Sequence, residues 1–63
     1  MLKEELLAFI EAEYAVTVVD IARKFDISIQ VASAVATSLQ KENKIYRRRA
    51  FGHTYLCIVE AED

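Results

Sequence analysis

The chain has 63 residues, of which 54% are hydrophobic and 29% are charged, and its net charge is −2. This length suits one small domain, and the apolar content is higher than that of a disordered peptide. Its apolar runs are shorter than the roughly 18 residues that a spanning helix needs, and its start lacks the features of a secretory signal, so we expect no membrane association.

Cysteine and histidine are too scarce to build most catalytic or metal sites. The single cysteine, Cys57, excludes an internal disulfide and favours a reducing, cytoplasmic location. One histidine and one cysteine cannot form the usual zinc tetrahedron, and the partners for a nucleophilic triad are too few. We therefore predict no metal, no cofactor and no catalytic residue, and we expect that the protein is not an enzyme.

The charges are unevenly distributed along the chain. Residues 1–31 carry three basic and six acidic side chains, whereas residues 32–63 carry five basic and four acidic ones. All five bases of the second half lie between Lys41 and Arg49, where Glu42 is the only acid. A local excess of positive charge attracts polyanions even on a chain whose net charge is negative.

The N-terminal segment predicts an amphipathic helix over residues 2–13. Its hydrophobic residues recur at steps of three and four, and most of its charged residues lie on the opposite side. The hydrophobic stripe, which is expected to face the core, consists of Leu2, Leu6, Leu7, Phe9, Ile10 and Tyr14.

A second helix is predicted over residues 18–25, after an N-cap at Thr17. Thr17 and Asp20 have the spacing of a capping box, in which the hydroxyl accepts from a first-turn N–H and the acid bonds back to the cap. The β-branched residues around this cap also allow a short strand over residues 14–17.

A third helix is predicted over residues 29–42. Ser28 is a suitable N-cap, and Asn43 is a suitable end because asparagine tolerates the left-handed backbone conformation. The apolar face of this helix consists of Ala32, Val35, Ala36 and Leu39.

The remainder of the chain predicts a β-hairpin over residues 45–59. Aromatic and β-branched residues dominate it, and Gly52–His53 interrupts them as a turn. The acidic residues 60–63 are expected to form a frayed tail. The predicted fold is therefore one domain over residues 1–63, mainly α with a C-terminal β-hairpin (α+β).

The second strand of this hairpin is apolar over all of Tyr55–Val59, so both of its faces are expected to be covered. Either the helix over residues 2–13 covers the second face, or another copy of the chain does, which predicts a homodimer. Cys57 within this strand is expected to pack in the core, where free cysteine behaves as a small hydrophobe.

These elements follow the order helix, short strand, helix, helix and hairpin. This order resembles that of a winged helix-turn-helix domain. Residues 21–28 resemble its first helix and turn, because Ala22 is small enough for close packing, Phe25 closes the helix and Ser28 starts the recognition helix. Residues 43–48 resemble the step from that helix into the wing. Small stand-alone transcriptional regulators of bacterial fimbrial operons, and archaeal and viral mini-regulators, have this organisation.

The sequence departs from the family pattern in two places. Asp26 stands where the turn usually has glycine, although aspartate can adopt a positive φ at modest cost. The exposed face of the third helix contains no arginine.

The resemblance implies that the third helix enters the major groove of double-stranded DNA. Glutamine can pair with adenine, serine and threonine can bond to either base class, and isoleucine or alanine can contact a thymine methyl, so the expected preference leans towards A·T pairs. The candidate residues on this helix are Ser28, Ile29, Gln30, Ser33, Ala34, Thr37 and Lys41. The alternative is that this small-residue face packs on another protein.

The hairpin carries the stronger signal for nucleic acid. Arg47, Arg48 and Arg49 are consecutive, and because alternate residues of a strand face opposite sides, Arg48 is expected to point away from the other two. The candidate wing residues are Lys44, Arg47, Arg48, Arg49 and His53. The alternative is an edge strand whose charges only keep it from pairing with other chains.

These patterns support two main hypotheses. The first is a DNA-binding transcriptional regulator that acts as a homodimer and presents two recognition helices to double-stranded DNA. The second is a winged-helix adaptor that binds a protein partner without reading DNA. RNA binding through the wing arginines, Tyr46 and Tyr55 is a third and weaker hypothesis.

Overall fold

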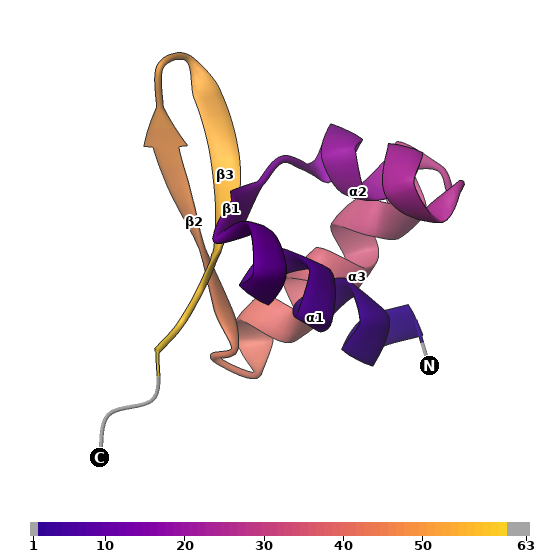
Figure 1. Ribbon diagram of the computed structural model, residues 1–63, viewed down its shortest axis with the longest axis horizontal. Helices are drawn as coiled ribbons and strands as arrows, with labels where there is room; N and C mark the ends of the chain where they lie inside the picture. Colours follow the sequence, from indigo (N-terminus) through magenta and orange to yellow (C-terminus); the bar gives the residue numbers. More distant parts are fainter. Residues whose placement is uncertain (1, 61–63) are drawn as a thin grey trace.

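Three helices, a short strand between the first two, and a C-terminal hairpin follow one another along the chain (Figure 1). The computed structural model describes residues 2–60. Its elements are α1 (Leu2–Glu13), β1 (Ala15–Val16), α2 (Val18–Phe25), α3 (Ile29–Lys41), β2 (Ile45–Ala50) and β3 (His53–Ile58). This order is that of a winged helix, and it confirms the predicted α+β class. Within residues 2–60, no helix is long and apolar enough to cross a membrane.

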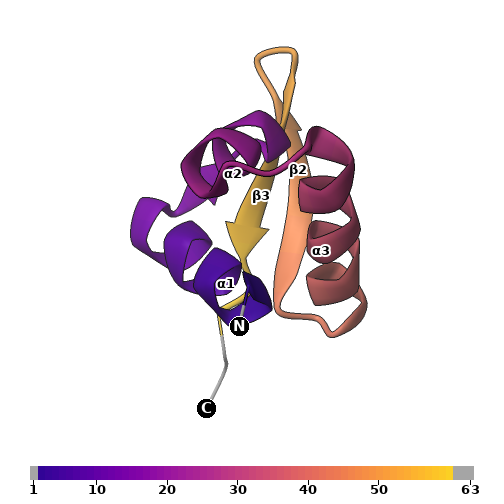
Figure 2. The ribbon, with the colours of Figure 1, turned by 90° about the vertical axis from the view of Figure 1, so that its right-hand side faces the viewer.

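The three strands form one antiparallel sheet in the order β1-β3-β2. All three helices lie on one side of this sheet (Figures 1 and 2). Directly paired residues of a sheet point to the same face. Leu56 is buried in the core against the helices, so its partners Val16 and Arg47 also lie on the helix side. The opposite face, which points away from the helices, we call the outer face. It carries Arg48 and its partner Tyr55.

The core lies between the helices and the inner face of the sheet. Its largest fully buried side chains are Leu6, Ile10, Ile21, Leu39, Ile45 and Leu56. Ala32 and Ala36 of α3 are also fully buried, and their small side chains allow α3 to lie close to its neighbours. Beside this core, the rings of Phe9 and Phe25 meet edge to face at 5.9 Å.

The helices begin and end at, or within one residue of, the positions that the capping residues predict. The capping box is present, since the N–H of Asp20 donates to Oγ1 of Thr17 (3.1 Å) and the N–H of Thr17 donates to Oδ2 of Asp20 (3.0 Å). Asp26 and Asn43, the two predicted left-handed residues, have φ of 55° and 61°. Helix α3 ends at Lys41, one residue earlier than predicted, because residue 42 is its C-cap.

The hairpin is present, but its turn lies one residue earlier than predicted. Ala50 pairs with His53, so Phe51 and Gly52 form a two-residue loop, with φ of 54° and 77°. His53 therefore belongs to β3 and not to the turn. Two central residues with positive φ define the type I′ geometry that matches the twist of the flanking strands. Most of the predicted acidic tail, residues 61–63, lies outside the described residues.

One of the two options from the sequence was that α1 covers the second face of the hairpin. In the structure, α1 does not cover that face. Helix α1 lies on the same side of the sheet as α2 and α3, because the apolar residues Leu56 and Ile58 face that side (Figure 2). Cys57 is 8% exposed, yet it lies on the outer face and outside the main core cluster. The predicted burial of Cys57 is confirmed, although strand alternation turns it away from Leu56, so it is buried on the outer face and not in the main cluster.

Replacing Phe51 with asparagine is expected to stabilise the fold. A bulky L residue with positive φ costs about 1 kcal/mol, whereas asparagine before glycine is a preferred type I′ pair. For a domain of this size, about 1 kcal/mol corresponds to a rise of about 4–8 °C in the melting temperature. Thermal denaturation followed by circular dichroism measures it. An unchanged or lower melting temperature for Phe51→Asn would contradict the turn geometry.

Candidate nucleic-acid interface

The exposed face of α3 begins with the N-cap at Ser28. The hydroxyl Oγ of Ser28 accepts from the N–H of Val31 (3.1 Å), which leaves its own proton free to donate. At 100° per residue, Gln30, Ala34 and Lys41 lie on the side opposite the buried residues, and all three are exposed. The face is therefore open to a large ligand, and its side chains are small or uncharged over most of its length.

Arg47 joins the hairpin to this helix. Its Nη1 donates to Oε1 of Gln40 (3.1 Å) and its Nη2 donates to Oγ1 of Thr37 (3.4 Å). All three residues lie at the protein surface, and α3 lies beside β2 in Figure 2. A guanidinium has five N–H donors, so Arg47 retains donors for an additional anion. The bonds thus place a cationic side chain directly beside the open face of α3.

The arginines divide between the two faces of the sheet. Arg47 and Arg49 pair with Leu56 and Thr54, so they lie on the face that looks towards α3. Arg48 pairs with Tyr55 and lies on the outer face. All three are exposed. A ligand bound along α3 can therefore contact Arg47 and Arg49, whereas Arg48 serves a different surface.

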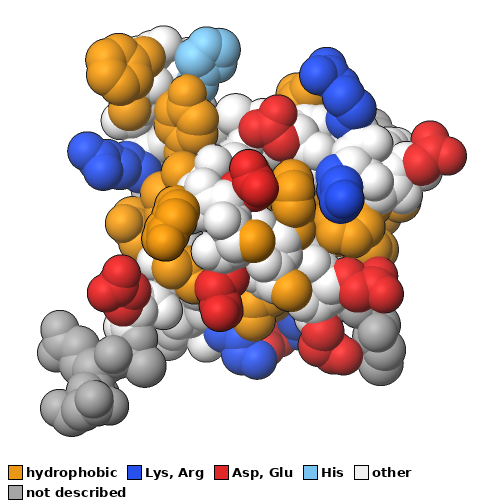
Figure 3. Space-filling model, in the orientation of Figure 1, with side chains coloured by type: hydrophobic (Ala, Val, Ile, Leu, Met, Phe, Trp, Pro, Cys, Tyr) orange, Lys and Arg blue, Asp and Glu red, His pale blue; other side chains and the backbone are white. Residues whose placement is uncertain are grey.

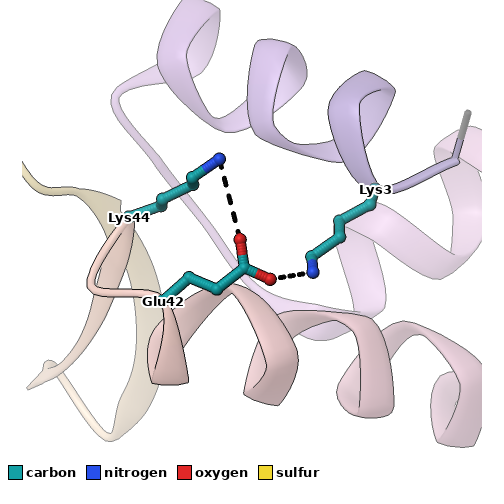
Figure 4. Close-up of polar contacts among 3 residues, drawn as sticks. All are labelled: Lys3, Glu42 and Lys44. Atoms are coloured by element: carbon teal, nitrogen blue, oxygen red, sulfur yellow. Dashed lines mark hydrogen bonds and ion pairs between the residues drawn. The ribbon is translucent and has the colours of Figure 1, made fainter.

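Lys44, a predicted wing residue, is engaged in an ion-pair cluster at the base of the hairpin (Figure 4). Glu42 pairs with Lys44 at 3.6 Å and also accepts a hydrogen bond from Nζ of Lys3. The side chains of these residues are 38% to 52% exposed, so each pair contributes at most about 1 kcal/mol. Glu42 therefore lowers the positive potential where α3 meets β2.

His53 is exposed at the start of β3. Its ring meets the ring of Tyr55 edge to face at 6.2 Å, on the outer face with Arg48. Apart from Lys44, the predicted residues thus form two groups. The first, on α3 and the inner edge of the hairpin, contains Ser28, Ile29, Gln30, Ser33, Ala34, Thr37, Lys41, Arg47 and Arg49. The second, on the outer face, contains Arg48 and His53.

Two residues of the surface were missed from the sequence. Gln40 was not a candidate, because its importance comes from the hydrogen bond to Arg47, which lies on a different element. Phe51 was not singled out either, although it is 95% exposed at the hairpin tip. Phe51 precedes Gly52 and lies between two segments rich in β-branched and aromatic residues. This pattern could have predicted that Phe51 belongs to the hairpin turn.

Comparison with known proteins found no matching family model, no matching curated protein and no matching solved structure. The fold is winged-helix-like by its topology.

Replacing Glu42 with glutamine is expected to increase binding to polyanions. The change frees the Lys3 and Lys44 ammonium groups beside α3, so the variant elutes from a heparin column at higher salt than the wild type. Because the pairs are exposed, its free energy of unfolding changes by less than about 1 kcal/mol. Glu11→Gln, which changes the net charge equally on α1, is the matched control. Equal elution shifts for both variants would contradict a localised basic surface.

Proposed function

We propose that this protein binds double-stranded DNA as a small transcriptional regulator. Helix α3 lies in the major groove, and the inner edge of the hairpin contacts the phosphates beside it. The observation that supports this most strongly is the pair of hydrogen bonds from Arg47 to Thr37 and Gln40. These bonds place a cationic side chain of the hairpin beside the open face of α3, so a duplex on the helix can also contact the strand.

Each part of this surface has its own role in the proposed complex. Arg47 and Arg49 neutralise phosphates and supply affinity that does not depend on sequence. Gln30 is exposed in the first turn of α3, where it can bond to an adenine edge, and the small Ala34 lets the helix approach the groove closely. Ser28 donates its free hydroxyl proton to a backbone phosphate.

The predicted homodimer remains part of this proposal because it suits paired half-sites, and its interface is not the outer face of the hairpin. Two copies related by a twofold axis would present two recognition helices to half-sites one helical turn apart. The test is the stoichiometry of the complex on a duplex that contains one or two half-sites.

A second candidate function is that of a protein-binding adaptor. Ile29 and Val31 at the start of α3 are 55% and 45% exposed, and the exposed face of this helix has no arginine. A partner protein with an apolar groove could cover them. An electrophoretic mobility shift on mixed duplex DNA at low salt distinguishes the two functions. A shift supports DNA binding, and none at tens of micromolar protein supports the adaptor.

The affinity for duplex DNA is expected to fall steeply with salt. Neutralising four or five phosphates per subunit implies a slope of about −4 for the logarithm of the association constant against that of salt concentration. Fluorescence anisotropy with a labelled duplex measures this slope. An affinity that does not change with salt would contradict the proposed electrostatic contacts.

Two substitutions should separate affinity from sequence preference. Arg49→Ala is expected to weaken binding to all duplexes similarly and to make the salt slope about 1 less negative, because it removes one phosphate contact. Gln30→Ala is expected to change the preference for one base pair by about 1–3 kcal/mol. Lys24→Ala is the control, because its ammonium lies over the Phe9 ring, away from the hairpin. If Lys24→Ala weakens binding as much as Arg49→Ala, the proposed orientation is wrong.

A further inference from the structure

The outer face of the hairpin combines aromatic rings with positive charge. Tyr46, Arg48 and Tyr55 share this face, since Arg48 pairs with Tyr55 and Tyr46 pairs with the neighbouring Cys57. Diagonal neighbours such as Tyr46 and Tyr55 lie about 7–8 Å apart. His53 continues the row towards the tip and contacts the Tyr55 ring. Figure 3 shows hydrophobic side chains over the hairpin, with acidic side chains over the helices and below it.

An open hollow of about 220 Å³ lies in this face. Small side chains from three strand positions, Ala15, Ala50 and Cys57, line it together with the larger Arg48, Phe51 and Tyr55. The hollow thus has two aromatic rings and one guanidinium around it. A flat ring that enters it can stack on Phe51 or Tyr55, while Arg48 remains within reach of an anion.

Phe51 is held at the end of this hollow at a cost to stability. Its side chain is 95% exposed and its φ is 54°, a conformation that bulky residues rarely adopt. The fold gains little from the ring, because almost none of it is buried. A position that retains an exposed aromatic ring in an unfavourable backbone conformation is typical of a binding site, where ligand contact offsets the strain.

The charge of the hairpin decides which ligand fits. Residues 45–59 contain three arginines and one histidine and no acidic residue. A second copy stacked on this face would bring Arg48 against another cationic hairpin, and like charges in a dry interface are unfavourable. A polyanion has the complementary charge. Exposed aromatic rings among cations are also the side chains on which unpaired bases stack.

We propose that the outer face binds single-stranded nucleic acid. One unpaired base stacks in the hollow between Phe51 and Tyr55, the next stacks on Tyr46, and Arg48 contacts the phosphate that joins them. This site lies on the opposite side of the sheet from α3, so it goes beyond the proposed binding of duplex DNA. The shared ligand chemistry is unpaired bases on a phosphodiester chain, and either DNA or RNA can supply it.

The test compares two aromatic residues in the same kind of backbone position. Phe51→Asn removes the ring from the hollow, whereas Tyr14→Asn removes the other strongly exposed ring, which is 78% exposed with φ of 70° and lies beside Glu11 and Glu60. Asparagine suits both positions, so both variants are expected to fold. Binding of labelled dT15 and rU15 oligonucleotides is measured by anisotropy. The expected result is a loss of about tenfold for Phe51→Asn, because stacking contributes about 1–3 kcal/mol per base, and a change below twofold for Tyr14→Asn.

A second probe makes the two proposed surfaces distinguishable. Blunt-ended duplex DNA offers a long paired segment to α3 and has no single-stranded loop. The affinity of Phe51→Asn for this duplex should differ less than twofold from that of the wild type. Arg48→Gln should make the salt slope on dT15 about 0.7 less negative, which corresponds to one phosphate of a single strand. If the wild type binds dT15 but not the blunt-ended duplex, the proposed function fails and this inference stands.

Three results would overturn the inference. The first is unchanged binding of both oligonucleotides by Phe51→Asn. The second is an equal loss with Tyr14→Asn, which would show that exposed aromatic rings act without regard to position. The third is a shift from dimer to monomer in Phe51→Asn, measured by light scattering, with a loss of oligonucleotide binding that disappears at protein concentrations where the variant is again a dimer. That result would assign the outer face to a second copy of the chain. A preference between dT15 and rU15 identifies which nucleic acid is bound.

Discussion

The pairing register of β2 with β3 is the constraint on which the rest of the structure depends. It places Ile45 opposite Ile58 and Arg47 opposite Leu56, so the core residues and the α3-facing arginines share one side of the sheet. A shift of one residue would turn Leu56 to solvent and Tyr55 into the core, because side chains alternate along a strand. The two-residue loop at Phe51 and Gly52 sets this register. The packing of the core and the division of charges therefore have the same cause.

This register gives the small domain two chemically different surfaces. On the helix side, hydrogen bonds from Arg47 to Thr37 and Gln40 join the hairpin to α3, and the resulting surface is polar with cations along one edge. On the outer side, Tyr55 and Phe51 surround a shallow hollow beside Arg48. A duplex needs phosphate contacts and a protruding helix, whereas unpaired bases need exposed rings. The two proposals are therefore assigned to opposite faces of the same hairpin.

Local chemistry was sufficient to predict the elements and most of their ends. The caps at Thr17 and Ser28 and the left-handed residues Asp26 and Asn43 depend on neighbouring atoms, and such effects are readable from short segments. Strand alternation likewise predicted that Arg48 points away from its neighbours. The position of the turn was harder to predict. Phe51 is a poor candidate for a positive φ, and a single glycine does not determine which two residues of a hairpin form the turn.

The candidate site was less predictable than the fold because it depends on contacts between elements. No local pattern indicates that Gln40 meets Arg47, that Glu42 pairs with Lys3 from the other end of the chain, or that Cys57 is buried on the outer face. Each of these follows from how α3 packs beside β2, and from the register of the sheet. Residue types therefore indicated that the surface is cationic, while the fold determined which cations act together.

We propose that α3 and the inner edge of the hairpin form one surface for duplex DNA. Backbone amide shifts of the ¹⁵N-labelled protein, recorded during titration with blunt-ended duplex DNA, test it most directly. Changes are expected along the exposed face of α3 and at Arg47 and Arg49, with little change at Tyr46 and Tyr55. Changes confined to the outer face, or no changes at low salt, would contradict it.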